Sequence, residues 1–405
     1  MTDRAWRQTP VDALTDFENG LDFVALRAYR LDRARAALKR AGYPACLLFD
    51  PVNIRYACGL RRGPLFQMHM PLRYLFIAVE GPVILFGASD VGLETIDEYR
   101  TGAMIPYLFG GPRTDEAVAR CVDEIAALVG QFAGERVLAL DRADPRVFNR
   151  LASHGIAVRD AQEPLEQARA IKSREEVQCM NYAIAVAEIA MARMREQLEP
   201  GMTENELWAE LWRTNMAMGG DWIEGRLFAS GERTNPWFQE CSDRVIRPGE
   251  LVAFDTDMIG PFGYCADISR TFRAGPSKPT PAQRELYRIA HEQLEHNIAL
   301  LRPGIGFREW SERAWPQPAR FAPNRYAVLA HGVGLCDEYP AIYYREDWPS
   351  LGYDGTVEPH MVLCVESYIG AVDGREGVKL EEQVLVTDDG IERLSHFPFE
   401  DELMV

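Results

Sequence analysis

The sequence predicts an α/β N-terminal domain followed by an α+β C-terminal domain. The chain has 405 residues, of which 47% are hydrophobic, and this is enough for two cores. Helical patterns and short apolar strand patterns alternate over roughly the first 160 residues, which is typical of α/β domains. Beyond them, several apolar strand patterns carry acidic residues or a histidine. Such groups are rarely buried without a partner, and a metal ion would be one.

The N-terminal domain is expected to span residues 1–165 and to begin with an irregular arm of about 25 residues. An amphipathic helix at 25–41 follows, stopped by Gly42 and Pro44. Residues 165–172 are expected to connect the two domains. The remaining expected elements are strands at 45–49, 72–79, 82–86 and 136–140, and helices at 116–132 and 145–152.

The C-terminal domain is expected to span residues 166–405. A long helix at 174–197 ends before Pro200 and Gly201, and Thr203–Glu206 has the capping-box pattern that opens the next helix. Later expected elements are a helix at 281–302 and strands at 362–369 and 378–386.

Three aspartates form the first candidate metal ligands. Asp255 and Asp257 lie in an apolar run that predicts a strand, and alternation would place both carboxylates on one face. The turn signal at Gly260–Gly263 would fold a second strand back, so that Asp267 lies across from them. Three convergent carboxylates would repel one another, and a cation between them would remove that repulsion.

A histidine and glutamates further along the chain supply more ligands of the expected types. His331 lies between an apolar run and a glycine-rich turn, and Glu366 ends an otherwise apolar run. Glu381 and Glu382 lie in one predicted strand, so alternation sends them to opposite faces, and the pattern leaves open which one faces inward. This oxygen-rich set with one imidazole suits iron, manganese, cobalt or zinc and is large enough for two ions.

Composition excludes several other classes of protein. The net charge of −17 argues against a nucleic-acid partner, since phosphate binding needs basic patches. No apolar stretch approaches the ~20 residues of a membrane helix, and the N-terminus lacks the layout of a secretory signal. The eight cysteines contain no CxxC pair, which favours reduced thiols in a cytoplasmic protein.

Taken in order, these motifs resemble the pita-bread metallopeptidase family, which includes Xaa-Pro dipeptidase, aminopeptidase P, methionine aminopeptidase and creatinase. The resemblance lies in the order Asp, Asp, His, Glu, Glu and in contexts such as Gly-Tyr-x-x-Asp-Ile-x-Arg around Asp267 and His-Gly-x-Gly-Leu from His331. Residues 30–60 resemble the creatinase-type N-terminal domain, and 170–177 resemble the start of the pita-bread domain. The resemblance implies that Asp267, His331, Glu366 and Glu381 bind metal, with Glu382 at the family's following acidic position. It also implies a homodimer.

The chain departs from the peptidases at three places. Peptidases space their two ligand aspartates eleven residues apart, whereas Asp255 lies twelve and Asp257 ten residues before Asp267, so the first ligand is ambiguous. Trp237 stands where the peptidases usually have a histidine after proline. The segment after His331 is one residue shorter than in the peptidases, and Asp337 stands where they have their second histidine. Both histidines contact the scissile peptide, so their loss with retained metal ligands indicates a different substrate.

This combination resembles the pita-bread dimethylsulfoniopropionate (DMSP) lyases, the DddP family, which cleave a C–S bond on the same scaffold. By that resemblance both close aspartates bind metal, and the ligand set is Asp255, Asp257, Asp267, His331, Glu366 and Glu381. Asp337 is then the catalytic base, and Tyr326 falls where the family has an active-site tyrosine. The resemblance implies two transition-metal ions, with iron favoured over Zn, Mn, Co, Ni or Cu.

The residue types suit this chemistry. DMSP is a small zwitterion with a carboxylate, an acidic Cα–H and a sulfonium leaving group on Cβ. A metal-bound carboxylate stabilises the charge that develops as the proton leaves, and an unligated carboxylate such as Asp337 can take that proton. A sulfonium is attracted to aromatic faces, which makes Trp237 a candidate substrate contact. Simple packing is the alternative role for Trp237 and Tyr326.

Three alternatives remain open at this point. A Xaa-Pro-type peptidase would keep the ligands but lack both histidines. Creatinase-like amidine hydrolysis works without metal and would not need the ligand set. A non-catalytic pita-bread module that binds protein partners would have no reason to retain the ligand types.

Overall fold

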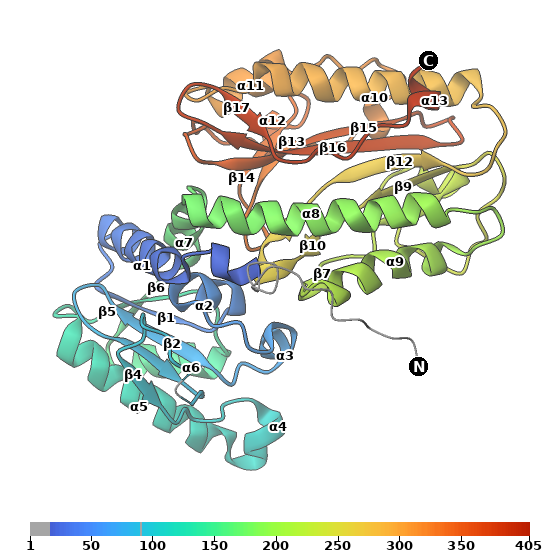
Figure 1. Ribbon diagram of the computed structural model, residues 1–405. Coiled ribbons are helices and arrows are strands. Elements are labelled where there is room, and N and C mark those ends of the chain that lie inside the picture. The colour runs from blue at the N-terminus through green and yellow to red at the C-terminus, as the bar shows by residue number, and fades with distance from the viewer. Residues whose placement is uncertain (1–16, 90) are drawn as a thin grey trace, which may run out of the picture.

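The computed structural model describes residues 17–89 and 91–405. Residues 1–16 of the predicted N-terminal arm therefore lie outside the described residues. Figure 1 shows two parts, an N-terminal part built around one sheet and a larger C-terminal part in which strands lie between helices. This arrangement confirms the predicted α/β domain followed by an α+β pita-bread domain.

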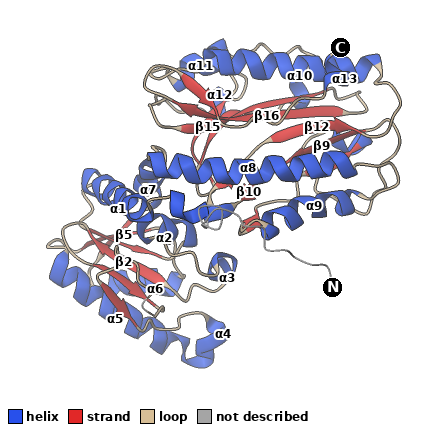
Figure 2. Ribbon diagram, viewed as in Figure 1, coloured by secondary structure: helices blue, strands red, loops and turns tan. Residues whose placement is uncertain are grey.

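The N-terminal part is a six-stranded sheet covered by helices on both faces (Figure 2). Its strand order is β4-β3-β2-β1-β5-β6, with β2 antiparallel to both β1 and β3 and the other pairs parallel. The strands are β1 (Ala45–Leu48), β2 (Tyr74–Ala78), β3 (Val83–Phe86), β4 (Glu98–Arg100), β5 (Val137–Leu140) and β6 (Ala157–Asp160), and the helices are α1 (Phe23–Arg40), α2 (Pro51–Cys58), α3 (Pro64–His69), α4 (Tyr107–Gly110), α5 (Thr114–Phe132), α6 (Pro145–Ser153) and α7 (Gln162–Arg169).

Alternation along β1 explains why both faces are covered. Leu47 packs into the core formed with α5 and α6, whereas Cys46 and Leu48 pack into the core shared with α1. That second core continues into the C-terminal part. The predicted connection at 165–172 is partly helical instead, because Leu165 and Ala168 of α7 are buried at helical spacing in that core.

The C-terminal part begins with two capped helices. In both α8 (Arg174–Gln197) and α9 (Glu204–Ala217), the side chain before the helix and a glutamate three residues later satisfy each other's backbone N–H groups, which confirms the predicted capping box at Thr203. The other helices are α10 (Pro281–Leu300), α11 (Phe307–Arg313), α12 (Trp348–Leu351) and α13 (Asp401–Met404).

Three sheets lie between these helices. Two are three-stranded, ordered β11-β10-β7 and β12-β9-β8, and one is five-stranded, ordered β14-β13-β15-β16-β17. The strands are β7 (Trp222–Ile223), β8 (Phe228–Ser230), β9 (Leu251–Asp255), β10 (Met258–Ile259), β11 (Cys265–Ala266), β12 (Ser269–Arg273), β13 (Val328–Val333), β14 (Asp337–Tyr343), β15 (Val362–Gly370), β16 (Gly377–Val386) and β17 (Ile391–Arg393).

The two faces of the five-stranded sheet have different roles. Leu363 and Val365 of β15 pack with Leu294 of α10 in one core, while Cys364 and Glu366 alternate to the opposite face. That opposite face looks toward β9 and β12, and α8 lies beyond them (Figure 1). Glu366 of β15 is therefore enclosed between two sheets. Among the described helices, none is both long enough and apolar enough to cross a membrane.

Candidate metal centre

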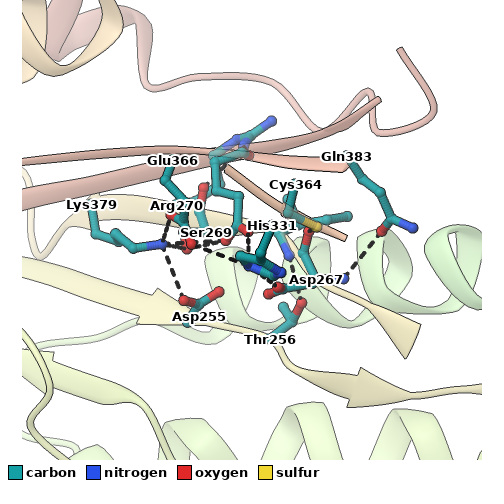
Figure 3. Close-up of polar contacts among 12 residues, drawn as sticks. Asp255, Thr256, Asp267, Ser269, Arg270, His331, Cys364, Glu366, Lys379 and Gln383 are labelled. Carbon is teal, nitrogen blue, oxygen red and sulfur yellow. Dashed lines mark hydrogen bonds and ion pairs between the residues drawn. The ribbon is translucent and has the colours of Figure 1, made fainter. Parts of the chain in front are cut away.

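Four of the predicted ligands, Asp255, Asp267, His331 and Glu366, point toward one another in the space between the two sheets (Figure 3). The potential ligand atoms in this space form three overlapping groups, and within each group all the atoms lie within 4.8 Å of one another. The groups are Asp255, Asp257 and Asp267; Asp255, Glu366 and Glu381; and Asp267, His331, Cys364 and Glu381. All six predicted ligands thus belong to one acidic cluster, and Cys364 is an additional neighbour.

A broken hairpin positions the three aspartates. The predicted fold-back is confirmed, since β12 pairs with β9 and places Ser269 opposite Asp255. The prediction that one strand carries both Asp255 and Asp257 is wrong. Strand β9 ends at Asp255, and Asp257 has φ 36°, a left-handed conformation outside the strand.

Thr256 fixes this break against the returning strand. Its hydroxyl donates to the carbonyl of Ala266 at 2.8 Å and accepts from the N–H of Ile268 at 3.0 Å. These two groups flank Asp267 in the chain. The hydroxyl therefore replaces regular strand pairing at the point where Asp255, Asp257 and Asp267 meet.

His331 is presented by β13, where two glycines allow the neighbouring strand to come close. A Cβ on Gly332 would lie 2.4 Å from the carbonyl oxygen of Tyr339, and one on Gly334 would collide with the Glu338 carboxylate. The His-Gly-x-Gly motif is thus needed for the tight β13–β14 hairpin. The Nδ1 atom of His331 lies 3.1 Å from the carbonyl oxygen of Gly332, which leaves Nε2 toward the cluster.

Glu366 and Glu381 face each other on neighbouring strands, as directly paired residues of β15 and β16. Like charges at such a position are destabilising unless a cation lies between them. Nε2 of His331 is 3.3 Å from Asp267 Oδ2, 3.4 Å from Glu366 Oε1 and 3.7 Å from Glu381 Oε1. These distances leave the imidazole and the three carboxylates facing one small volume.

Glu382 lies on the other face of β16 and does not join the cluster. Its carboxylate accepts from Nη2 of Arg270 at 2.6 Å and from the Ser395 hydroxyl. The family's following acidic position is thus a buried ion pair in this chain. Glu381 is the residue that faces inward.

Lys379 is a central residue that the sequence analysis missed. Its fully buried Nζ lies 2.5 Å from Glu366 Oε2, 3.1 Å from Asp255 Oδ2 and 3.3 Å from Glu381 Oε2, and it donates to the Ser269 hydroxyl at 2.6 Å. A lysine two residues before Glu381 in an apolar strand was the available signal, because alternation places both on one face.

Burial and mutual repulsion dominate the electrostatics of the cluster. Burial, followed by the charge of Glu381, raises the pKa of Asp255 to about 7 and raises that of Asp267 well above its ordinary value. Burial and then Asp255 likewise raise the pKa of Asp257. Without further positive charge, the three aspartates of the cluster therefore resist ionisation.

The cluster fits a metal centre by its unpaired oxygens. Asp255 Oδ1, Asp267 Oδ1 and Glu381 Oε1 are buried without a hydrogen-bond partner among the described residues, which is costly unless a cation contacts them. The second oxygens of Asp255 and Glu381 are held by Lys379. On one side of the cluster the carboxylate oxygens are therefore bonded to Lys379. On the other side the unpaired carboxylate oxygens are available as hard ligands for a metal ion.

The two predicted catalytic residues lie at the edge of the cluster. Asp337 begins β14, with its Oδ1 4.0 Å from Nδ1 of His331, and 48% of its side chain is exposed. Partial burial raises its pKa, His331 opposes the rise and Glu381 adds to it. The solvent that reaches Asp337 limits this effect. Burial, followed by Glu366, raises the pKa of Tyr326, so its phenol stays protonated.

Trp237 lies beside the cluster rather than in it. Its side chain is buried with Tyr368, and Tyr326 packs against the pair. The Nζ of Lys379 lies 5.6 Å from the ring centroids of both Trp237 and Tyr326. The indole thus already contacts one cation, as expected of an aromatic wall beside a charged site.

The chain is similar to known proteins with two different named activities. The DMSP lyase DddP of Roseovarius nubinhibens is 38% identical over 394 residues, which cover 95% of this chain and 88% of the relative. The DMSP lyase DddP of Roseobacter denitrificans is 36% identical with the same coverage. The chain is also 30% identical to the Xaa-Pro dipeptidase of Pyrococcus furiosus, over 57% of this chain.

Solved structures that share this fold include two proline-specific peptidases. The Xaa-Pro dipeptidase from Bacillus anthracis has a TM-score of 0.74 at 21% identity and covers 92% of this chain and 99% of its own. The X-Pro aminopeptidase from Thermotoga maritima has a TM-score of 0.71 at 22% identity, with 91% and 98% covered. The family models matched are Creatinase/Prolidase N-terminal domain at residues 30–171 and Metallopeptidase family M24 at 178–388. The chain therefore belongs to metallopeptidase family M24 and carries the creatinase/prolidase type of N-terminal domain.

Proposed function

We propose that this protein is a metal-dependent carbon–sulfur lyase that cleaves DMSP to dimethyl sulfide and acrylate. The observation that carries the proposal is the position of Asp337, a partly exposed carboxylate at the edge of a complete ligand cluster. Peptide hydrolysis in this family uses a histidine there. Relatives named as DMSP lyases, at 36% and 38% identity over almost the whole chain, support the same conclusion.

The acidic cluster would hold the metal, and Asp255, Asp257, Asp267, His331, Glu366 and Glu381 are the proposed ligands. When bound, the metal supplies Lewis acidity to the substrate carboxylate and stabilises the negative charge that develops next to it. Family M24 and the three overlapping ligand groups fit a dinuclear centre. We propose two ions, with iron favoured by resemblance to the DMSP lyases.

Asp337 would act as the general base. One carboxylate oxygen takes the proton from Cα of the substrate, and the C–H electron pair becomes the Cα–Cβ double bond. The Cβ–S bond breaks at the same time, and its electron pair leaves with sulfur as neutral dimethyl sulfide. Acrylate remains, and no water is consumed. The raised pKa of Asp337 brings its basicity closer to that required for proton abstraction.

Tyr326 and Trp237 would line the substrate pocket. Because the Tyr326 phenol stays protonated, it suits hydrogen bonding to the substrate better than proton removal. The Trp237 ring would contribute apolar surface and negative potential near the sulfonium. The ammonium of Lys379 already lies beside the rings of Trp237 and Tyr326. The sulfonium of the substrate must therefore contact another part of the same aromatic surface.

We further propose a homodimer that works in the cytoplasm, with a domain boundary near residue 165. All eight cysteines are free, and seven are buried, which suits a reducing compartment. Residue 165 lies within α7, between the last strand of the N-terminal sheet and α8. The dimer rests on family resemblance.

The proposal is tested with purified, metal-loaded protein and two substrates. Incubation with DMSP should release dimethyl sulfide and acrylate in equal amounts, and chelation should stop the release. A Xaa-Pro dipeptide offered in parallel should be cleaved far more slowly. Hydrolysis of the dipeptide without release of dimethyl sulfide would instead identify a peptidase. Bound metal without either reaction would favour a binding module.

A further inference from the structure

Phe238 has an unusual backbone conformation for an aromatic residue. Its φ of 73° lies in the left-handed region, which bulky side chains rarely adopt, and its side chain is exposed. A strained and exposed aromatic residue gains little from core burial. Such conformations persist where surrounding contacts impose them, and they cluster at functional sites.

The Phe238 ring extends the aromatic surface at the edge of the metal centre. Its centroid lies 5.4 Å from that of Tyr326 and 6.4 Å from that of Trp237. The Trp237 ring in turn lies 6.2 Å from that of Tyr368. Four aromatic rings are thus linked, from Tyr368 in the core through Trp237 to the solvent-exposed Phe238, which also contacts Tyr326.

Asn235 holds this series in place. Its side-chain oxygen accepts from Nδ2 of Asn324 at 2.8 Å and from the hydroxyl of Tyr368 at 2.9 Å, and its Nδ2 donates to the carbonyl of Ala371 at 2.7 Å. These bonds join the segment before Trp237 and Phe238 to the segment before Tyr326. The exposed ring is therefore carried by a fixed loop, which pre-organises it for a ligand.

The inner rings are already paired with a cation. The Nζ of Lys379 lies 5.6 Å from the centroids of both Trp237 and Tyr326. Among the described residues, no lysine or arginine lies over the ring of Phe238. The aromatic face that remains available to a second cation is thus the outermost one.

We propose that Phe238 is the specificity-determining contact for the onium group of the substrate. This inference rests on the proposed function for one point, that the substrate carboxylate is held at the metal cluster. The matching ligand class is a short carboxylate with a methylated sulfonium or ammonium group at its other end. Such a group has no N–H or O–H to donate, so an aromatic face is a better partner for it than a hydrogen-bond acceptor.

The test compares two ligands that have the same shape and differ in charge. They are 3-(trimethylammonio)propanoate, which is cationic at one end, and 4,4-dimethylpentanoate, in which carbon replaces nitrogen. Their binding to the metal-loaded protein is measured by titration calorimetry, which needs no turnover. The variants are Phe238→Leu, which keeps an apolar side chain but removes the ring, and Phe238→Tyr, which keeps the ring.

Phe238→Leu should weaken binding of the ligand with the cationic end about five-fold and change binding of the ligand with the neutral end less than two-fold, because only the ammonium group uses the ring. Phe238→Tyr should bind both ligands like the wild type. Equal weakening of both ligands by Phe238→Leu would show simple packing and overturn the inference, as would no weakening of either. Thermal unfolding of each variant checks that the fold is intact.

The outcome is separate from that of the lyase assay. Charge-selective binding that depends on Phe238, without dimethyl sulfide release, would support the inference while the proposed reaction fails. Dimethyl sulfide release with no charge-selective effect of Phe238→Leu would overturn the inference alone.

Discussion

Glu381 and Glu382 are neighbours in β16, yet their carboxylates lie in different environments on opposite faces of the sheet. Glu381 faces Glu366, His331 and Lys379, and its Oε1 has no hydrogen-bond partner among the described residues. Glu382 is paired with Arg270 at 2.6 Å and with Ser395. This pair offers a matched test in which the same substitution is made at adjacent positions.

Glu381→Gln should lower the metal content of the purified protein to half or less, because an amide is a weaker ligand than a carboxylate. Glu382→Gln should keep the metal, but lose about 1–3 kcal/mol of stability, since the buried Arg270 loses its charged partner. Elemental analysis and urea unfolding measure the two effects. Equal metal loss in both variants would contradict the assignment of faces.

His331→Ala and Glu366→Ala should each remove metal from the cluster. Metal that binds only the folded state raises the melting temperature, so added metal should stabilise wild type and not these variants. Differential scanning fluorimetry with and without chelator is sufficient. Full metal content in both variants would rule out the proposed ligand set.

Lys379→Met should destabilise the metal-free protein more than the metal-loaded protein. Without metal, the ammonium is the nearest positive charge to Asp255, Glu366 and Glu381, and removing one partner from a buried ion pair costs about 3–5 kcal/mol. Bound metal would supply positive charge in its place. Urea unfolding of both forms gives the two losses, and identical losses would show that Lys379 does not share its role with the metal.

Glu338→Gln should lower kcat for the release of dimethyl sulfide from DMSP about ten-fold, while the metal content stays unchanged. The buried Glu338 carboxylate binds Lys172 at 2.6 Å and Arg169 at 2.8 Å, and these residues come from the segment that connects the two parts of the chain. Since Glu338 follows Asp337 directly, this clamp fixes the backbone that carries the proposed base. Unchanged kcat with lower stability would give Glu338 a purely structural role.

Much of the fold and of the cluster could be predicted from the sequence, because local patterns specify them. Capping at Thr203, the turn at Gly260–Gly263 and the alternation around Glu366 are each encoded within a few residues. Long-range packing decides the rest. Alternation could not say that Glu381 rather than Glu382 faces inward, since that depends on Arg270, more than a hundred residues away.

Three other features were not predicted, for different reasons. The left-handed conformation of Asp257 follows from the hydrogen bonds of Thr256 to the returning strand, which exist only after the hairpin forms. The role of Lys379 depends on three carboxylates from three different strands. The helix α7 was missed because its buried face packs against α1, which the local pattern does not reveal.

The most direct test of the central claim is the rate at which the Asp337→Asn variant releases dimethyl sulfide from DMSP at wild-type metal content. The amide keeps the size of the side chain but cannot take the proton from Cα. Because general base catalysis contributes about 10²–10⁴ in rate, kcat should fall at least about a hundred-fold, with little change in KM. Near-wild-type release with the metal in place would contradict the role of Asp337 as base and would make Tyr326 the next residue to test.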